Sequence, residues 1–244
     1  MEMLENIIEL IRDYWQVFIL EGLRYTLILS AIAVFFGVIF GAFIALGRMS
    51  NIKPFKKLNK KKAKKGFIHW LSEFNPVSWI CSVYIEVIRG TPLLLQLYLF
   101  VFGLPKIIPI SAGNFFWVSV ALACNSAAYV SELFRSGIQA VDKGQTEAAR
   151  SLGMNKAQTM MKVIMPQAIK NILPAVGNEF IAITKETSMA STFFIGDLMT
   201  SYLKVNGQTY LALEILIIVG AIYLAVTFVL SKLVLAYERR LNSK

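Results

Sequence analysis

The residues best placed to do chemistry in this chain are ionisable groups inside otherwise apolar stretches, above all Glu179, Lys185 and Glu186 within residues 171–195. Glu179 and Glu186 are seven residues apart, so they share one face of a helix. Asn178 and Lys185 have the same spacing and share the neighbouring face. Ionisable groups are costly in lipid and usually face a polar cavity or a partner. The pattern therefore predicts a polar pathway or a subunit contact, with mutual neutralisation of these charges as the structural alternative.

Residues 114–133 carry a second polar set, in which Asn125, Tyr129 and Glu132 follow one another at helical spacing and share a face. For every member of the two sets, ligand contact and structural pairing are equally open. The candidates for the lining of a pathway are Asn125, Tyr129, Glu132, Asn178, Glu179, Lys185, Glu186 and Ser188.

Residues 77–104 contain a carboxylate and a guanidinium three positions apart, a spacing that permits an ion pair on one helix face. A glycine and a proline follow, and proline removes a backbone donor, so we expect a kink that serves as a gate or hinge. Alternatively, the guanidinium snorkels at the inner membrane boundary, where a count of about 20 residues back from Leu104 puts it. The gate or hinge candidates are Glu86, Arg89, Gly90, Thr91 and Pro92.

Metal and nucleophile chemistry find little support in the sequence. The chain has two cysteines, Cys81 and Cys124, both in apolar surroundings, and one histidine, His69. A zinc site of the usual kind needs about four Cys or His ligands at set spacings, and neither cysteine lies in a Cys–His signature. The G-x-x-x-x-G-K-S/T phosphate loop is also missing. We therefore expect no metal site, no bound cofactor and no enzymatic activity, ATP hydrolysis included.

The elements that must position these groups follow from composition. Of 244 residues, 56% are hydrophobic and 16% are charged, against about 25% charged in an average soluble domain. This composition argues against a soluble domain, a disordered chain and a disulfide scaffold. It favours an all-α integral membrane protein with a single transmembrane domain, 20–237, because a membrane helix needs about 20 mostly apolar residues. The five stretches that qualify are residues 20–47, 77–104, 114–133, 171–195 and 211–237.

The two ends of the chain lie outside these spans. Residues 1–19 are predicted to form an amphipathic helix rather than a signal peptide, because apolar residues recur at helical spacing opposite four acids. Such a helix lies on a membrane surface, and its acidic face fits the outer surface better than the anionic cytoplasmic leaflet. Residues 238–244 form a short cytoplasmic tail.

The formal net charge of +10 first suggests nucleic-acid binding. However, residues 48–76, residues 135–170 and the C-terminal end hold 19 of the 25 basic residues, and the alternate segments hold four. Cytoplasmic segments are enriched in Lys and Arg, so we expect the N-terminus outside, the C-terminus in the cytoplasm and no nucleic-acid partner. The basic linker 48–76 is interpreted as a solvated segment beside anionic membrane lipids, with specific lipid or nucleic-acid binding as the alternative.

The predicted cytoplasmic segment 137–170 is the most informative part of the chain. Between residues 142 and 166 it is too polar to span a membrane, yet it is rich in helix formers, and Gly153 interrupts them. Two short helices that meet at a glycine form a compact knob. Interspersed apolar and charged residues suit such a knob to docking into a groove of a partner.

The run EAARSLGMNKAQTMMKVIMP in this segment resembles the coupling-loop signature of ABC-transporter permeases. That signature reads EAA, three residues, Gly, nine residues, Ile, one residue, Leu-Pro. Val163 and Met165 replace the Ile and Leu of the family, and both are apolar. The positions that match in identity and spacing are Glu147, Ala148, Ala149, Gly153 and Pro166.

Three further runs, YIEVIRGTPLLLQLYLF, SELFRSGIQAVDKGQTEAA and NEFIAITKETSMAS, are similar to the polar-amino-acid branch of these permeases. The similarity covers most of residues 22–237, and the spacing of its motifs is specific. The linker 48–76 departs from the branch because it is longer and richer in lysine, and its purpose is open.

The resemblance implies a type I ABC importer permease in a bacterial inner or plasma membrane. Two permease chains, identical or only similar, form the translocation pathway. Two cytoplasmic ATPase subunits hold ATP and Mg²⁺, and an extracytoplasmic binding protein delivers an amino acid that the sequence does not specify. Lys185 then meets the carboxylate of this zwitterion, while Glu132, Glu179 or Glu186 meets an ammonium or guanidinium group.

Within the coupling loop, the resemblance implies that Glu147 contacts the ATPase; the alternative is a helix-starting acid favoured by the helix dipole. Gly153 allows a bend or a close approach that a side chain would block. The coupling residues are Gly144, Glu147, Ala148, Ala149, Gly153 and Met154. An alternative function is a membrane anchor that docks a cytoplasmic partner without a transport path, but ionisable residues in three spans favour transport.

Overall fold

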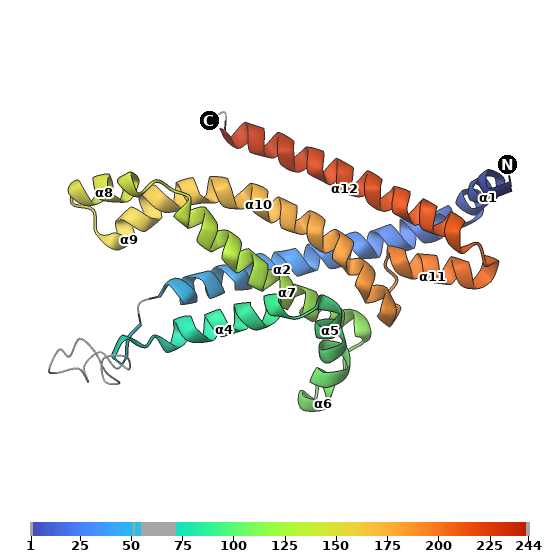
Figure 1. The fold of residues 1–244 in the computed structure, drawn as a ribbon, viewed down its shortest axis with the longest axis horizontal. Coiled ribbons are helices and arrows are strands. Elements are labelled where there is room, and N and C mark those ends of the chain that lie inside the picture. The colour runs from blue at the N-terminus through green and yellow to red at the C-terminus, as the bar shows by residue number, and fades with distance from the viewer. Residues whose placement is uncertain (1, 51, 55–71, 243–244) are drawn as a thin grey trace.

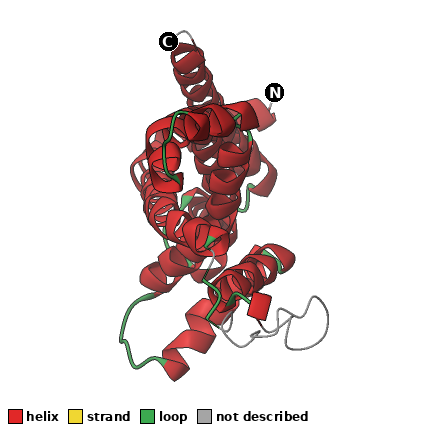
Figure 2. Ribbon diagram, turned by 90° about the vertical axis from the view of Figure 1, so that its left-hand side faces the viewer, coloured by secondary structure: helices red, strands yellow, loops and turns green. Residues whose placement is uncertain are grey.

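The structure, a computed structural model, describes residues 2–50, 52–54 and 72–242, and every regular element in these ranges is a helix (Figures 1 and 2). Most of the linker 48–76 and the end of the tail 238–244 lie outside the described residues. The long helices run roughly along one axis, and the two chain ends point toward opposite ends of it (Figure 1).

The first helix extends far beyond the span predicted for residues 20–47. α1 (Glu2–Gln16), a π-helical segment (Val17–Leu23) and α2 (Arg24–Met49) follow one another without a break and form one helix of 48 residues. At 1.5 Å per residue it is about 72 Å long, against a hydrocarbon core of about 30 Å. The helix predicted for residues 1–19 is therefore continuous with the span predicted for residues 20–47, and no loop separates them.

The second span is broken into α4 (Pro76–Gly90) and a second half, Leu93–Ile107, which is bent from it by 109°. The second half lies off the side of the bundle in Figure 1. It contains α5 (Leu93–Tyr98), a π-helical segment (Leu99–Gly103) and α6 (Leu104–Ile107). The kink expected after Arg89 is therefore a sharp turn. Counting back from Leu104 does not give the depth of Arg89, because the second half does not continue the direction of the first.

The rest of the chain supplies the remaining helices of the bundle. In chain order these are α7 (Asn114–Gln139), α8 (Lys143–Ser151), α9 (Lys156–Thr159), a π-helical segment (Met160–Ile164), α10 (Met165–Glu186), a 3₁₀ helix (Thr187–Phe193), α11 (Leu198–Thr209) and α12 (Ala212–Asn242). From Lys156 to Glu186 the backbone stays helical. Pro166, which has no backbone N–H, lies two residues after the end of the π-helical segment, where the hydrogen-bond ladder is already shifted.

The number of membrane spans is only partly settled by composition. Two of the described helices are long and apolar enough to cross a membrane, Glu2–Met49 and Ala212–Leu241, and the bent pair adds a third if it counts as one span. α7 and α10 have 26 and 22 residues, which is long enough, but their polar residues leave no sufficiently apolar window. The count of five transmembrane helices therefore stays a prediction.

The main core lies between α2 and α7. Gly37 and Gly41 on α2 permit a close approach of the two backbones, because an added Cβ would lie 2.5 Å from Ser126 Oγ and 2.9 Å from the Ala127 carbonyl oxygen, respectively. The G-x-x-x-G spacing in the first span therefore serves helix packing. The buried apolar side chains around this contact include Leu29, Leu97, Val118, Leu122 and Ile183.

A second core joins the N-terminal segment to α11 and α12. Its buried members include Leu10, Phe18, Leu198, Val205 and Ile215. Asp197, which is fully buried, caps α11 by accepting a hydrogen bond from the Met199 backbone N–H at 3.0 Å. The neighbouring Leu198 N–H donates to Thr26 Oγ1 at 3.0 Å, which fixes the start of α11 on α2.

The α2–α7 contact generates a stability prediction. We expect Gly41→Val to lower the apparent melting temperature of the purified protein in detergent, because overpacking costs about 1–3 kcal/mol. Gly220→Val is the matched control, since a Cβ at Gly220 meets no atom within 4 Å. Equal melting temperatures for the two variants would contradict the close-contact role of Gly41.

Candidate functional site

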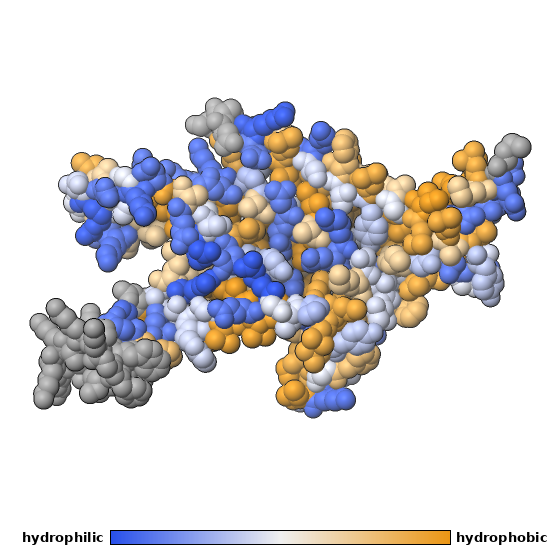
Figure 3. Space-filling view, viewed as in Figure 1, coloured by the Kyte–Doolittle hydropathy of each residue, from blue (hydrophilic) through white to orange (hydrophobic). Residues whose placement is uncertain are grey.

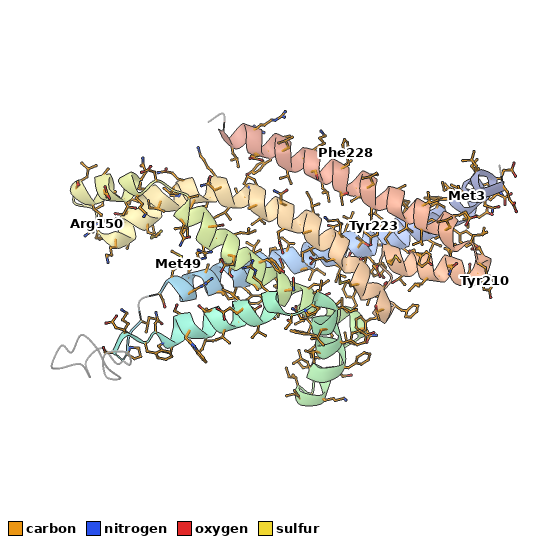
Figure 4. All side chains as sticks on the ribbon, in the orientation of Figure 1. Met3, Met49, Arg150, Tyr210, Tyr223 and Phe228 are labelled. Atoms are coloured by element: carbon orange, nitrogen blue, oxygen red, sulfur yellow. The ribbon has the colours of Figure 1, made fainter. Side chains whose placement is uncertain are left out.

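α8 and α9 form the predicted knob, which projects from one end of the bundle. Figure 4 shows Arg150 at this end and Met3 and Tyr210 at the opposite end. Each short helix carries its own start signal. The Asp142 carboxylate accepts a hydrogen bond from the Gly144 backbone N–H at 2.6 Å, so a capped first turn starts α8. α9 starts with a capping box formed by Asn155 and Gln158.

The turn between the two helices explains the spacing of the EAA-to-Gly motif. The Met154 N–H donates to the Ala149 carbonyl and the Gly153 N–H donates to the Arg150 carbonyl, both at 3.1 Å. This pair of bonds is a Schellman motif, which requires a left-handed residue at the position of Gly153. Gly153 has φ +84°, and an added Cβ would meet no atom within 4 Å. The structure therefore supports the bend among the two predicted roles for Gly153, and within this chain no atom approaches the glycine closely.

The knob presents both apolar and charged groups at its surface. Leu152 is 84% exposed and Met161 is 74% exposed, and the Glu147 side chain is exposed as well. Of the two alanines in the motif, Ala148 is exposed and Ala149 is buried. Large apolar side chains next to an exposed carboxylate are the features expected of a docking surface.

A buried amide organises the break between α4 and α5. Gln96 Nε2 lies 2.6 Å from the Ile88 carbonyl oxygen and 3.1 Å from the Thr91 carbonyl oxygen. The Oε1 atom of the same side chain accepts a hydrogen bond from Asn125 Nδ2 on α7 at 2.9 Å. Gln96 and Asn125 are each 3% exposed. The bend is therefore held together, and held onto α7, by two amide side chains.

One turn along α7 from Asn125, the predicted gate and pathway residues meet. The guanidinium carbon of Arg89 lies 5.2 Å from the centre of the Tyr129 ring, a cation–π contact. Arg89 is in none of the ion pairs formed among the described residues, so the ion pair with Glu86 that the spacing permits is not formed. Both partners of the cation–π contact are exposed on the single chain.

The Glu132 carboxylate forms two ion pairs within the chain. It is paired with Arg48, at the end of α2, and with Arg135, whose Nε and Nη2 lie 2.8 and 2.6 Å from Oε2. Arg48 is 84 residues away in the chain. Two guanidiniums around one carboxylate favour the structural alternative for Glu132 over contact with a ligand.

The polar residues of α10 have a different environment. On α10, Asn178 and Lys185 are exposed and Glu179 and Glu186 are half-buried, and Ser188, in the 3₁₀ helix that follows, is half-buried as well. Lys185 takes part in no ion pair within the described ranges. In the space-filling view, hydrophilic residues gather over α7 and α10, whereas α5 and α6 are mostly hydrophobic (Figure 3). The exposed polar side chains of α10 are therefore available to a ligand or to a second subunit.

The remaining reactive side chains form no recognisable centre. In residues 2–50, 52–54 and 72–242, no three His, Cys, Asp or Glu side chains are placed to hold a metal ion. Cys81 and Cys124 are free and half-buried. The single histidine, His69, lies outside the described residues.

Comparison with known proteins assigns the fold and the knob to a family. Residues 66–243 match the family described as "Binding-protein-dependent transport system inner membrane component". The chain belongs to this family. The matched region includes the broken span, the knob and the α10 set, so all candidate residues named above lie on a permease scaffold.

Individual relatives of this permease point the same way. It is 40% identical to the arginine transport system permease protein ArtQ of Bacillus subtilis over 93% of both chains. It is 37% identical to a putative glutamine transport system permease protein GlnP of Rickettsia bellii, over 92% of this chain and 93% of the relative. A crystal structure of an amino acid ABC transporter with histidines superposes with a TM-score of 0.81 at 46% identity, covering 93% and 95% of the two chains. These findings confirm the predicted amino-acid ABC permease family.

Sequence reasoning about this permease missed two residues that hold the site. Gln96 lies in the run LLLQLY, and a lone amide in an apolar stretch was the available signal. In the sequence, Arg48 is recognisable only as one of the basic residues that indicate the orientation of the chain in the membrane. Neither its distance in sequence from Glu132 nor its place at a helix end marks it as a partner, so no sequence signal pointed to that pair.

The Schellman turn of the permease generates a second prediction. Gly153→Ala should weaken the turn, because a left-handed conformation costs a residue with a Cβ about 1–2 kcal/mol. We expect faster amide hydrogen exchange across residues 149–155, measured by mass spectrometry. Gly153→Asn should exchange at a rate closer to that of the wild type, because asparagine tolerates this conformation. Exchange in Gly153→Ala that matches the wild type would exclude backbone strain as the reason for the glycine.

Proposed function

We propose that this chain is the pathway-forming permease subunit of an ATP-driven importer of a polar amino acid. It pairs with a second permease chain and engages two ATPase subunits through α8 and α9. ATP and Mg²⁺ belong to those partners, and an extracytoplasmic binding protein supplies the amino acid. The observation that carries the proposal is the knob itself, a capped and rigidly turned pair of helices with exposed apolar and acidic side chains.

The proposed orientation has the N-terminus outside and the knob and C-terminus in the cytoplasm. In support, the chain ends point toward opposite ends of the long axis, and the C-terminal end lies toward the knob (Figure 1). Of the 25 basic residues, 19 lie in segments that this orientation assigns to the cytoplasm. A bacterial plasma membrane is the proposed location.

The proposed substrate is a polar amino acid. Relatives named for arginine, glutamine and nopaline transport support this class. Lys185 on α10 is exposed and has no ion-pair partner in the described part of the chain, so it is suited to the substrate carboxylate. Glu179 and Glu186, on the neighbouring face of the helix, are suited to an ammonium or guanidinium group.

Glu147 provides the test of ATPase coupling. We expect Glu147→Lys to reduce co-purification of the ATPase subunit about tenfold, because reversing a charge at an interface replaces an attraction with a repulsion. Glu5→Lys is the matched control, since Glu5 is an exposed acid on α1, the helix that lies at the opposite end of the molecule from α8 (Figure 1). Unchanged co-purification and unchanged transport would remove Glu147 from the interface and leave it as a helix-starting acid.

Lys185 provides the test of the pathway. In proteoliposomes that contain the whole transporter, we expect Lys185→Met to lower labelled amino-acid uptake about tenfold, because a charge-assisted hydrogen bond is lost. Assembly with the ATPase should be retained. Lys170→Met, an exposed lysine on the same helix, should transport normally. Loss of assembly in Lys185→Met would instead support a structural role in charge neutralisation.

A further inference from the structure

The break between α4 and α5 creates a specific hydrogen-bonding deficit. In an unbroken helix, the backbone N–H of residue 92 would donate to the Ile88 carbonyl four residues earlier. Pro92 has no N–H, and Thr91 and Pro92 are extended rather than helical. The Ile88 carbonyl therefore lacks its helical donor at a partly buried position, and an unpaired carbonyl away from water costs about 1–3 kcal/mol.

The Gln96 side chain supplies that donor from the far side of the bend. Its Nε2 lies 2.6 Å from the Ile88 carbonyl oxygen and 2.9 Å from Thr91 Oγ1. Thr91 Oγ1 in turn donates to the Val87 carbonyl at 2.8 Å. One buried amide thus closes the last turn of α4, the turn that carries Arg89.

The same amide sets the register of this turn on α7. Gln96 Oε1 accepts from Asn125 Nδ2, and four residues further along α7 the Tyr129 ring receives Arg89. Asn125 and Tyr129 lie one turn apart, so the two contacts are successive steps on one face of α7. The body of α4 has its own attachment, because the Tyr84 hydroxyl donates to the Cys124 carbonyl at 2.6 Å. Loss of the amide is therefore expected to release the last turn of α4 and to leave the rest of the helix in place.

We propose that Gln96 is a positioning residue of the permease, which holds the Arg89 guanidinium over Tyr129 beside the pathway without touching the substrate. The proposal rests on the proposed transport function for the role of Arg89. In this proposal the α4–α5 bend is a fixed part of the pathway wall, and a buried neutral amide orients the charged Arg89 side chain.

A double-mutant cycle tests this dependence in the whole transporter. Gln96→Met keeps the length of the side chain and removes the donor. We expect it to lower the uptake of labelled arginine or glutamine about tenfold, because buried carbonyls lose their partner. In an Arg89→Ala background the same change should have almost no further effect, because nothing is left to position. The matched control Gln16→Leu, at an exposed glutamine, should transport normally.

The outcomes separate positioning from general support of the fold. If Gln96→Met lowers uptake by the same factor with and without Arg89, the two residues act independently and the proposal is wrong. If Gln96→Met does not assemble, Asn125→Leu removes the tie to α7 from the other side and should show the same dependence on Arg89.

Hydrogen exchange gives a readout that needs no transport. In the purified complex, Gln96→Met should speed amide exchange in residues 87–91 and leave residues 77–84 at the wild-type rate. Faster exchange along all of α4 would mean that Gln96 only supports the fold. If the wild type takes up no polar amino acid, the proposed function fails, while the exchange pattern still decides whether Gln96 positions the Arg89 turn.

Discussion

Every break in a helix of this permease leaves backbone groups that the surrounding apolar side chains cannot satisfy. At three of these breaks, particular hydrogen bonds satisfy the free backbone groups. Gln96 donates to the Ile88 carbonyl at the bend, and a Schellman turn around Gly153 closes α8. Asp197 caps the start of α11 from a fully buried position. Gln96 and Asp197 are buried, so they are stabilising because an unpaired amide or carbonyl away from water is costly. The turn around Gly153 lies on the exposed knob instead. All three devices fix where the chain changes direction.

The helical class and the knob could be predicted because their signals are local. Gly153 marked the turn by sequence alone, since the left-handed position of a Schellman motif favours the residue without a Cβ. Pro92 also marked the kink by sequence alone, because proline has no backbone N–H to donate within a helix. The angle of 109° was not predictable, because it depends on which carbonyls Gln96 reaches across the bend. The pairing of Glu132 with Arg48 was not predictable either, since only the packing of α2 on α7 brings these two residues together.

The candidate site divides into polar groups that are already paired and polar groups that are not. Glu132, Gln96 and Asn125 have partners within the chain, so they hold the permease in shape. Asn178 and Lys185 are exposed on α10. Sequence spacing shows which polar residues share a helix face, but it does not show which of them are paired. The partners that decide this come from other helices.

The unbroken helix from Lys156 to Glu186 has a mechanical consequence. Its first turn belongs to the knob, and its last turn carries Lys185. The same helical element therefore carries part of the knob at one end and the side chains of Lys185 and Glu186 at the other. A movement delivered at the knob therefore reaches Lys185 through one continuous helical element, in which the π-helical segment Met160–Ile164 and Pro174 are the places where the helix bends most easily.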